Sequence, residues 1–155
     1  MRPGGSNMRD SLTGLEYMRL VASGEVEAGP FTKLLGMRIT EVDEGRVVFT
    51  AELKPEHENT IGIAHGGFAA TLLDSAMGCA ANSVMPAGRV FTTLEMKINY
   101  VRPIRRENGT LTCVATLIHA GGRTATAEGR ILDADGVLYA HGTITCFLYK
   151  ETHHE

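Results

Sequence analysis

The sequence predicts an α+β fold in which a long antiparallel sheet curves around one central helix. Two strand-like segments come before a single long helical segment, and four longer strand-like segments follow it. The helical segment, from about Gly66 to Val84, is more apolar than a surface helix should be. Wrapping by the chain's own sheet would bury most of this helix, and a partner subunit could cover the remainder.

Length and composition limit the class of protein. A chain of 155 residues is long enough for one domain with a substantial core. The formal net charge of −3, without a strongly basic stripe, argues against a nucleic-acid partner. The three widely spaced cysteines indicate reduced thiols in a cytoplasmic protein, and neither a signal peptide nor a membrane span is recognisable.

The N-terminal part reads as an extension to the main domain. Residues 1–10 are expected to be a disordered leader, and 151–155 a tail. Residues 11–32 are expected to form a helical extension, capped by Thr13 or Ser11. The main domain is then expected over residues 33–150.

Turn residues divide the main domain into its elements. Glu44-Gly45 predicts a tight hairpin between strands over Met37–Asp43 and Arg46–Leu53, and a loop is expected over Lys54–Ala64. Pro86 and Gly88 close the central helix. The rest of the chain predicts four strands in a meander, over residues 91–102, 109–120, 123–134 and 138–149.

Asp74 interrupts the apolar helix, and it is the only Asp, Glu, Lys or Arg between Glu58 and Arg89. A carboxylate buried on a helix costs several kcal/mol unless it is hydrogen-bonded or neutralised, so a functional role is expected. The alternative is an acid satisfied by a partner in the core.

At the start of the helix, Gly66 and Gly67 would let a ligand approach the unpaired backbone N–H groups, although close helix–strand packing also explains glycine there.

These residues form part of a longer motif. Asn59-x5-His65-Gly66-Gly67-x6-Asp74, followed by a strand from Thr93 to Pro103, resembles the PaaI-type (4-hydroxybenzoyl-CoA thioesterase-like) acyl-CoA thioesterases of the hotdog fold. The resemblance covers about residues 33–149. It implies a sheet wrapped around the central helix, homodimers with active sites at the subunit interface, and dimers paired into homotetramers.

The resemblance also implies catalytic roles. Asp74 corresponds to the carboxylate that acts as general base or as nucleophile, and the Gly66 N–H to the donor that polarises the thioester carbonyl. Asn59 would help to position the thioester and His65 would support the site, although an Asn can merely fix a loop turn and a His before a helix is often a cap. Thr93 corresponds to a hydroxyl that in some members comes from the partner subunit and holds the attacking water.

Further residues are expected to contact the CoA part of the substrate. Gly122, Arg123 and Thr124 correspond to a strand-edge segment that meets CoA in related enzymes. Arg102 could attract the CoA phosphates, or it could simply be solvated at a strand end. Gly67 would leave room for the ligand at the helix start.

The predicted function is hydrolysis of aryl- or medium-chain acyl-CoA to free acid and CoA. CoA is then part of the substrate, no separate cofactor is required, and we see no metal-ligand set in the sequence. One alternative is a module that binds acyl-CoA without turnover. Another is a hotdog hydratase acting on enoyl thioesters, which the absence of an Asp-x-Asn-Pro-x-His or His-Phe-Pro pattern disfavours.

Overall fold

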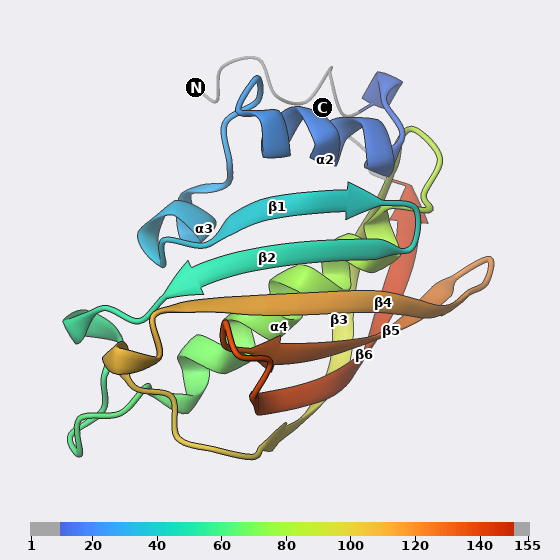
Figure 1. The fold of residues 1–155 in the computed structure, drawn as a ribbon. Coiled ribbons are helices and arrows are strands. Elements are labelled where there is room, and N and C mark those ends of the chain that lie inside the picture. The colour runs from blue at the N-terminus through green and yellow to red at the C-terminus, as the bar shows by residue number, and fades with distance from the viewer. Residues whose placement is uncertain (1–9, 151–155) are drawn as a thin grey trace.

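Six antiparallel strands form one sheet that curves around helix α4 (Figure 1). The computed structural model describes residues 10–150, so nearly all of the expected leader and all of the expected tail lie outside the described residues. The strands are β1 (Arg38–Asp43), β2 (Arg46–Glu52), β3 (Arg89–Tyr100), β4 (Thr110–Ala120), β5 (Thr124–Leu132) and β6 (Leu138–Lys150). The helices are α2 (Gly14–Ser23), α3 (Pro30–Leu34) and α4 (Gly66–Asn82), with short 3₁₀ turns η1 (Pro55–His57) and η2 (Arg106–Asn108).

The predicted four-strand meander is wrong at its first strand. The strand order is β1-β2-β4-β5-β6-β3, so only β4, β5 and β6 form a meander. β3 pairs with β6 at the far edge, and β4 pairs with β2. The physical reason is that α4 crosses the concave face of the sheet, and the chain therefore enters the sheet again at the opposite edge. Strand pattern alone carries no information on this pairing.

The core lies between α4 and the sheet. α4 contacts every strand from β2 to β6. Its residues Leu72, Leu73, Ala76, Met77 and Ala80 are fully buried. Burial on this scale, at about 25 cal/mol per Å² of apolar surface, explains why a helix so poor in charge is stable in this fold.

The N-terminal helix α2 is part of the same packed structure. Its N-terminus is held by a capping box, in which the side chains of Thr13, the N-cap, and Glu16 each accept the other's backbone N–H. The Gly14 N–H donates to the Met85 carbonyl at 3.0 Å, which ties α2 to the segment after α4. Figure 1 shows α2 lying alongside β1, and Met18 is buried against the core.

One long edge of the sheet is formed by β3. The β3–β6 register shifts between Thr93 and Glu95, so Leu94 is an extra residue in the strand and 58% of its surface is exposed. Such a bulge changes the direction of the side chains around it and is frequent beside active sites.

No helix within residues 10–150 has the length and hydropathy needed to cross a membrane.

Candidate active site

Asp74 and Thr93 are brought together by α4 and β3. The Thr93 hydroxyl donates a hydrogen bond of 2.8 Å to Asp74 Oδ1. Both residues belong to the same chain, so Thr93 does not need to come from a partner subunit to reach this carboxylate. We call this pair the carboxylate half of the site.

The sheet register explains why Thr93 faces the helix. Thr93 lies opposite Cys146 of β6, which is fully buried, and directly paired residues of antiparallel strands point to the same face. Burial raises the pKa of Cys146 to about 11, and the negative charge of Asp74 adds to this effect. Cys146 is therefore a neutral, unreactive core residue at neutral pH.

Asp74 is half-buried, rather than buried in the apolar core as its sequence context suggested. The reason is that Asp74 meets the sheet only at its edge strand, β3. It faces a cavity of about 690 Å³, whose wall also includes Ser75, Cys79 and Phe91. The alternative interpretation, in which Asp74 is an acid enclosed in the core, is therefore wrong.

The N-terminus of α4 forms a second set of groups, which we call the amide half. His65 is the N-cap of α4, and its Nδ1 accepts the Gly67 N–H at 2.9 Å. The Phe68 N–H donates to the His65 carbonyl at 2.9 Å. As the first helical residue, Gly66 has an N–H that the helix itself cannot pair, and the helix dipole makes this a favourable place for a developing oxyanion. His65 is therefore a capping residue, which was one of the two readings of the sequence.

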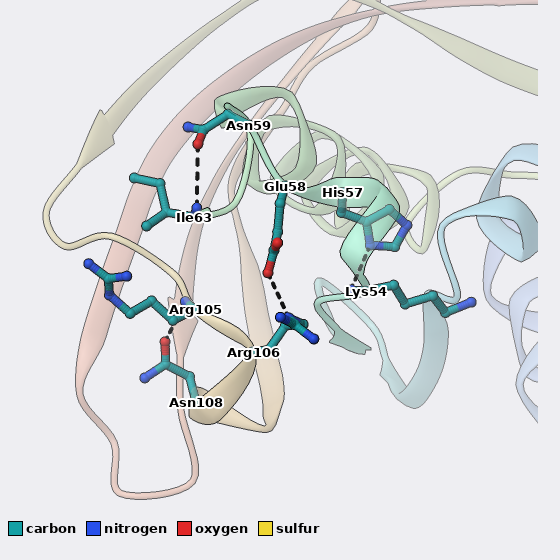
Figure 2. Close-up of polar contacts among 8 residues, drawn as sticks. All are labelled: Lys54, His57, Glu58, Asn59, Ile63, Arg105, Arg106 and Asn108. Carbon is teal, nitrogen blue, oxygen red and sulfur yellow. Dashed lines mark hydrogen bonds and ion pairs between the residues drawn. The ribbon is translucent and has the colours of Figure 1, made fainter. Parts of the chain in front are cut away.

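Asn59 stabilises the loop that precedes α4. Its Oδ1 accepts the N–H groups of Ile61 at 3.1 Å and Ile63 at 3.3 Å, and Figure 2 shows the second of these bonds. The side-chain amide nitrogen remains the group that could act on a ligand. Asn59 and Gly66 line the same cavity, of about 420 Å³. The loop-turn reading of Asn59 is thus confirmed, and a role in substrate positioning stays a prediction.

Two aromatic residues support the amide half and were not singled out as site residues from the sequence. The Tyr100 hydroxyl donates to the Gly66 carbonyl at 3.0 Å. His57 is buried, stacks on Phe68 with ring centroids 4.9 Å apart, and accepts the His65 N–H on its carbonyl at 2.8 Å. Burial holds the pKa of His57 below its usual value, so the neutral ring is favoured. These roles depend on contacts between elements that are distant in sequence, and neither Tyr100 nor His57 belongs to a local sequence motif.

The residues expected to contact CoA lie in two places. Arg102 lines the smaller cavity with Gly66, and its guanidinium donates to the Leu138 carbonyl at 2.7 Å. Gly122 lies at the turn between β4 and β5, where its carbonyl accepts a bond from Arg89 at 2.9 Å. The neighbouring Arg123 guanidinium sits 5.5 Å from the centre of the Phe147 ring.

The turn segment 122–124 is exposed and lines neither of the two cavities described above. Gly67 is also exposed, in the first turn of α4. Close to the smaller cavity, Arg106 of η2 forms an ion pair of 2.7 Å with Glu58 (Figure 2). Within residues 10–150, no group of three or more His, Cys, Asp or Glu side chains is placed to hold a metal ion.

The two halves do not meet within one chain. Gly66 and Asp74 are eight residues apart on α4, which is about 12 Å along the helix axis at about 1.5 Å per residue. They also line different cavities. A donor and a base must both lie about 3 Å from the reacting atoms, so this Gly66 and this Asp74 cannot serve one thioester together.

Comparison with known proteins identifies the family. The family model of the thioesterase superfamily matches residues 61–140. The chain is 25% identical to the medium/long-chain acyl-CoA thioesterase YigI of Escherichia coli over 149 residues, covering 86% of this chain and 95% of that protein. It is 31% identical to the 1,4-dihydroxy-2-naphthoyl-CoA hydrolase of Listeria monocytogenes over 100 residues, covering 64% of this chain and 79% of that protein.

Solved structures agree with this assignment. The E. coli PaaI protein of the phenylacetic acid degradation operon superposes with a TM-score of 0.78 at 26% identity, covering 90% of this chain and 99% of the other. A thioesterase family protein from Silicibacter pomeroyi gives a TM-score of 0.76 at 26% identity, covering 86% and 99%. The chain therefore belongs to the thioesterase superfamily, and it is an enzyme for thioester hydrolysis built on the hotdog fold.

Proposed function

We propose that the protein hydrolyses acyl-CoA thioesters, at a site that combines the carboxylate half of one subunit with the amide half of another. The single observation that carries this proposal is the separation of Gly66 from Asp74 on one helix, given that each faces its own cavity. Relatives named as acyl-CoA hydrolases support CoA as the thiol part of the substrate.

The exposed faces of the chain support a symmetric dimer. β3 forms an edge of the sheet and most of its residues from Thr92 to Tyr100 are exposed, which leaves backbone groups for pairing with a second β3. On the N-terminal half of α4, Gly67 is exposed and Ala70 and Thr71 are only half-buried. Small residues there allow close approach of a second α4.

A twofold axis near Ala70 would complete both sites. If two α4 helices run antiparallel with Ala70 at the axis, then Gly66 of each lies opposite Asp74 of the other, because residue 70 is midway between them. In an isologous interface, each contact between two residues occurs twice. The dimer therefore has two equal sites. Two such dimers could pair into a tetramer, and light scattering of the purified protein distinguishes the two states.

The chemistry then follows from the two halves. Asp74, oriented by Thr93, accepts a proton from water as the water oxygen attacks the carbonyl carbon. The Gly66 N–H of the other subunit stabilises the oxyanion that develops. The C–S bond then breaks, CoA leaves as a thiolate and takes up a proton, and the acid is released. In the alternative route the Asp74 carboxylate attacks the carbonyl itself, and water hydrolyses the resulting anhydride.

Thiol release from a panel of aryl- and fatty acyl-CoAs tests the proposal. Wild type should release free CoA, and Asp74→Asn should lose this activity while keeping its fold and oligomeric state. Saturable binding of acyl-CoA without any thiol release by wild type would instead favour the binding-module alternative. A chelator in the assay should leave the rate unchanged, since the proposed route uses no metal ion.

A further inference from the structure

The larger cavity lies between the N-terminal helix α2, strand β1 and helix α4, with Asp74 in its wall. We propose that this cavity, which we call the acyl chamber, receives an aliphatic acyl chain of the substrate and that α2 forms its outer wall and sets the accepted chain length. This inference rests on the proposed function and deepens it, because it assigns a substrate class to the carboxylate half of the site.

The chamber leads away from the reaction centre along α4. Asp74, Cys79 and Asn82 all line it, and Asp74 and Asn82 are about 12 Å apart along the helix axis. This path runs from Asp74 toward the C-terminal end of α4. A thioester held beside Asp74 can therefore extend its acyl chain into the chamber.

The buried part of the wall is apolar. Met18, Met37 and Phe49 line the chamber and are each only 2% exposed. Among the polar lining residues, Ser23 and Glu27 are exposed and belong to the outer rim, whereas Asn82 and Arg89 are half-buried near the C-terminal end of α4. A volume of about 690 Å³ falls in the range of small-molecule sites, about 300–1,000 Å³. Methionine is a pliable wall residue, which suits a flexible alkyl chain.

The position of α2 is fixed by backbone contacts, so its side chains define the depth of the chamber. The Gly14 N–H bonds to the Met85 carbonyl at 3.0 Å. A Cβ atom at Gly14 would lie 1.9 Å from the Asn82 carbonyl oxygen, which shows how closely the start of α2 approaches the end of α4. Val21, half-buried and one turn after Met18, lines the chamber and can be enlarged or reduced without changing these contacts.

The test is a chain-length profile of kcat/KM for butanoyl-, octanoyl-, dodecanoyl- and hexadecanoyl-CoA. Val21→Phe should lower the ratio of dodecanoyl to butanoyl kcat/KM at least tenfold, because the added ring occupies chamber volume. Val21→Ala should move the optimum toward longer chains. Arg19→Phe is the matched control, since it adds the same ring to the same helix at an exposed position that does not line the chamber.

Binding measurements keep this test separate from the proposed function. The affinity of each variant for dodecanoyl-CoA and butanoyl-CoA is measured by titration calorimetry in an Asp74→Asn background, where turnover is not expected. If wild type hydrolyses no acyl-CoA but Val21→Phe still weakens dodecanoyl-CoA binding selectively, the acyl chamber stands and the proposed function fails. Unchanged chain-length ratios in both Val21 variants, or an equal change in Arg19→Phe, would overturn the acyl chamber.

Discussion

Gly66 and Asp74 lie on the same helix but serve different cavities, and helix geometry keeps them about 12 Å apart. Each has its own support: Tyr100 bonds to the Gly66 carbonyl, and Thr93 bonds to the Asp74 carboxylate. Because of this separation, the proposed site needs a second copy of the chain to be complete.

Removal of the Gly66 N–H should slow the chemical step. Gly66→Pro eliminates the donor, and proline is well accepted at the first position of a helix. His65 has φ −59° and ψ 138°, which is compatible with a following proline. We expect kcat to fall by about 10²–10³ with little change in the unfolding midpoint.

Gly66→Ala is the control for this variant because it keeps the N–H. Its Cβ would lie 3.3 Å from the Tyr100 hydroxyl, a close contact that a small movement of the tyrosine can relieve. Equal losses of kcat in the proline and alanine variants would show that the N–H is not the important group.

Loss of the Thr93 hydroxyl should reduce activity less than loss of Asp74. Hydrogen bonds to charged groups contribute about 1.5–3 kcal/mol, so Thr93→Val should lower kcat by about 10- to 100-fold if the whole contribution is made in the transition state. Thr93→Ser keeps the hydroxyl and should retain most of the activity. A serine variant as slow as the valine variant would argue that Thr93 acts through packing instead.

The fold should lose stability as the pH falls through the range in which free histidine titrates. Burial lowers the pKa of His57 in the folded state, so below about pH 6.5 the unfolded chain binds the proton more readily than the folded chain does. The contribution of His57 to stability is then lost with decreasing pH. Urea unfolding at pH 7.5 and 5.5 should show a smaller decrease in His57→Gln than in wild type, and an identical decrease would contradict the assignment to His57.

Close packing between α2 and α4 predicts a stability effect at Gly14. A Cβ at this position would lie 1.9 Å from a backbone oxygen of Asn82, which cannot move without shifting the helix end. Gly14→Ala should therefore lower the free energy of unfolding by about 1–3 kcal/mol. Gly122→Ala is the comparison, because nothing lies within 4 Å of the added carbon, and it should unfold almost as wild type does in urea.

Local patterns in the sequence predicted most of the elements. The hairpin at Glu44-Gly45, the cap at Thr13 and the long apolar helix are all present, because turn residues, capping residues and periodicity act over a few positions. The position of β3 at the far edge was not predictable, since strand pairing is a long-range property. For the same reason, the bulge at Leu94 has no signature in the sequence.

The candidate site was predicted only in part. The resemblance assigned roles to Asp74 and Gly66, and the structure adds that they face different cavities. His57 and Tyr100 were missed because their partners lie on other elements. The partial exposure of Asp74 was also missed, since apolar neighbours in sequence do not show which helix residues lie at the edge of the sheet.

A heterodimer experiment tests the shared site most directly. Asp74→Asn and Gly66→Pro chains are co-expressed with different affinity tags, and the doubly tagged heterodimer is purified and assayed for thiol release. One of its two sites then carries both substitutions and the other carries neither, so activity should recover to about half that of wild type, although each homodimer is almost inactive. Activity no higher than that of the two parent variants would contradict the account, because it would mean that Gly66 and Asp74 do not act across the interface.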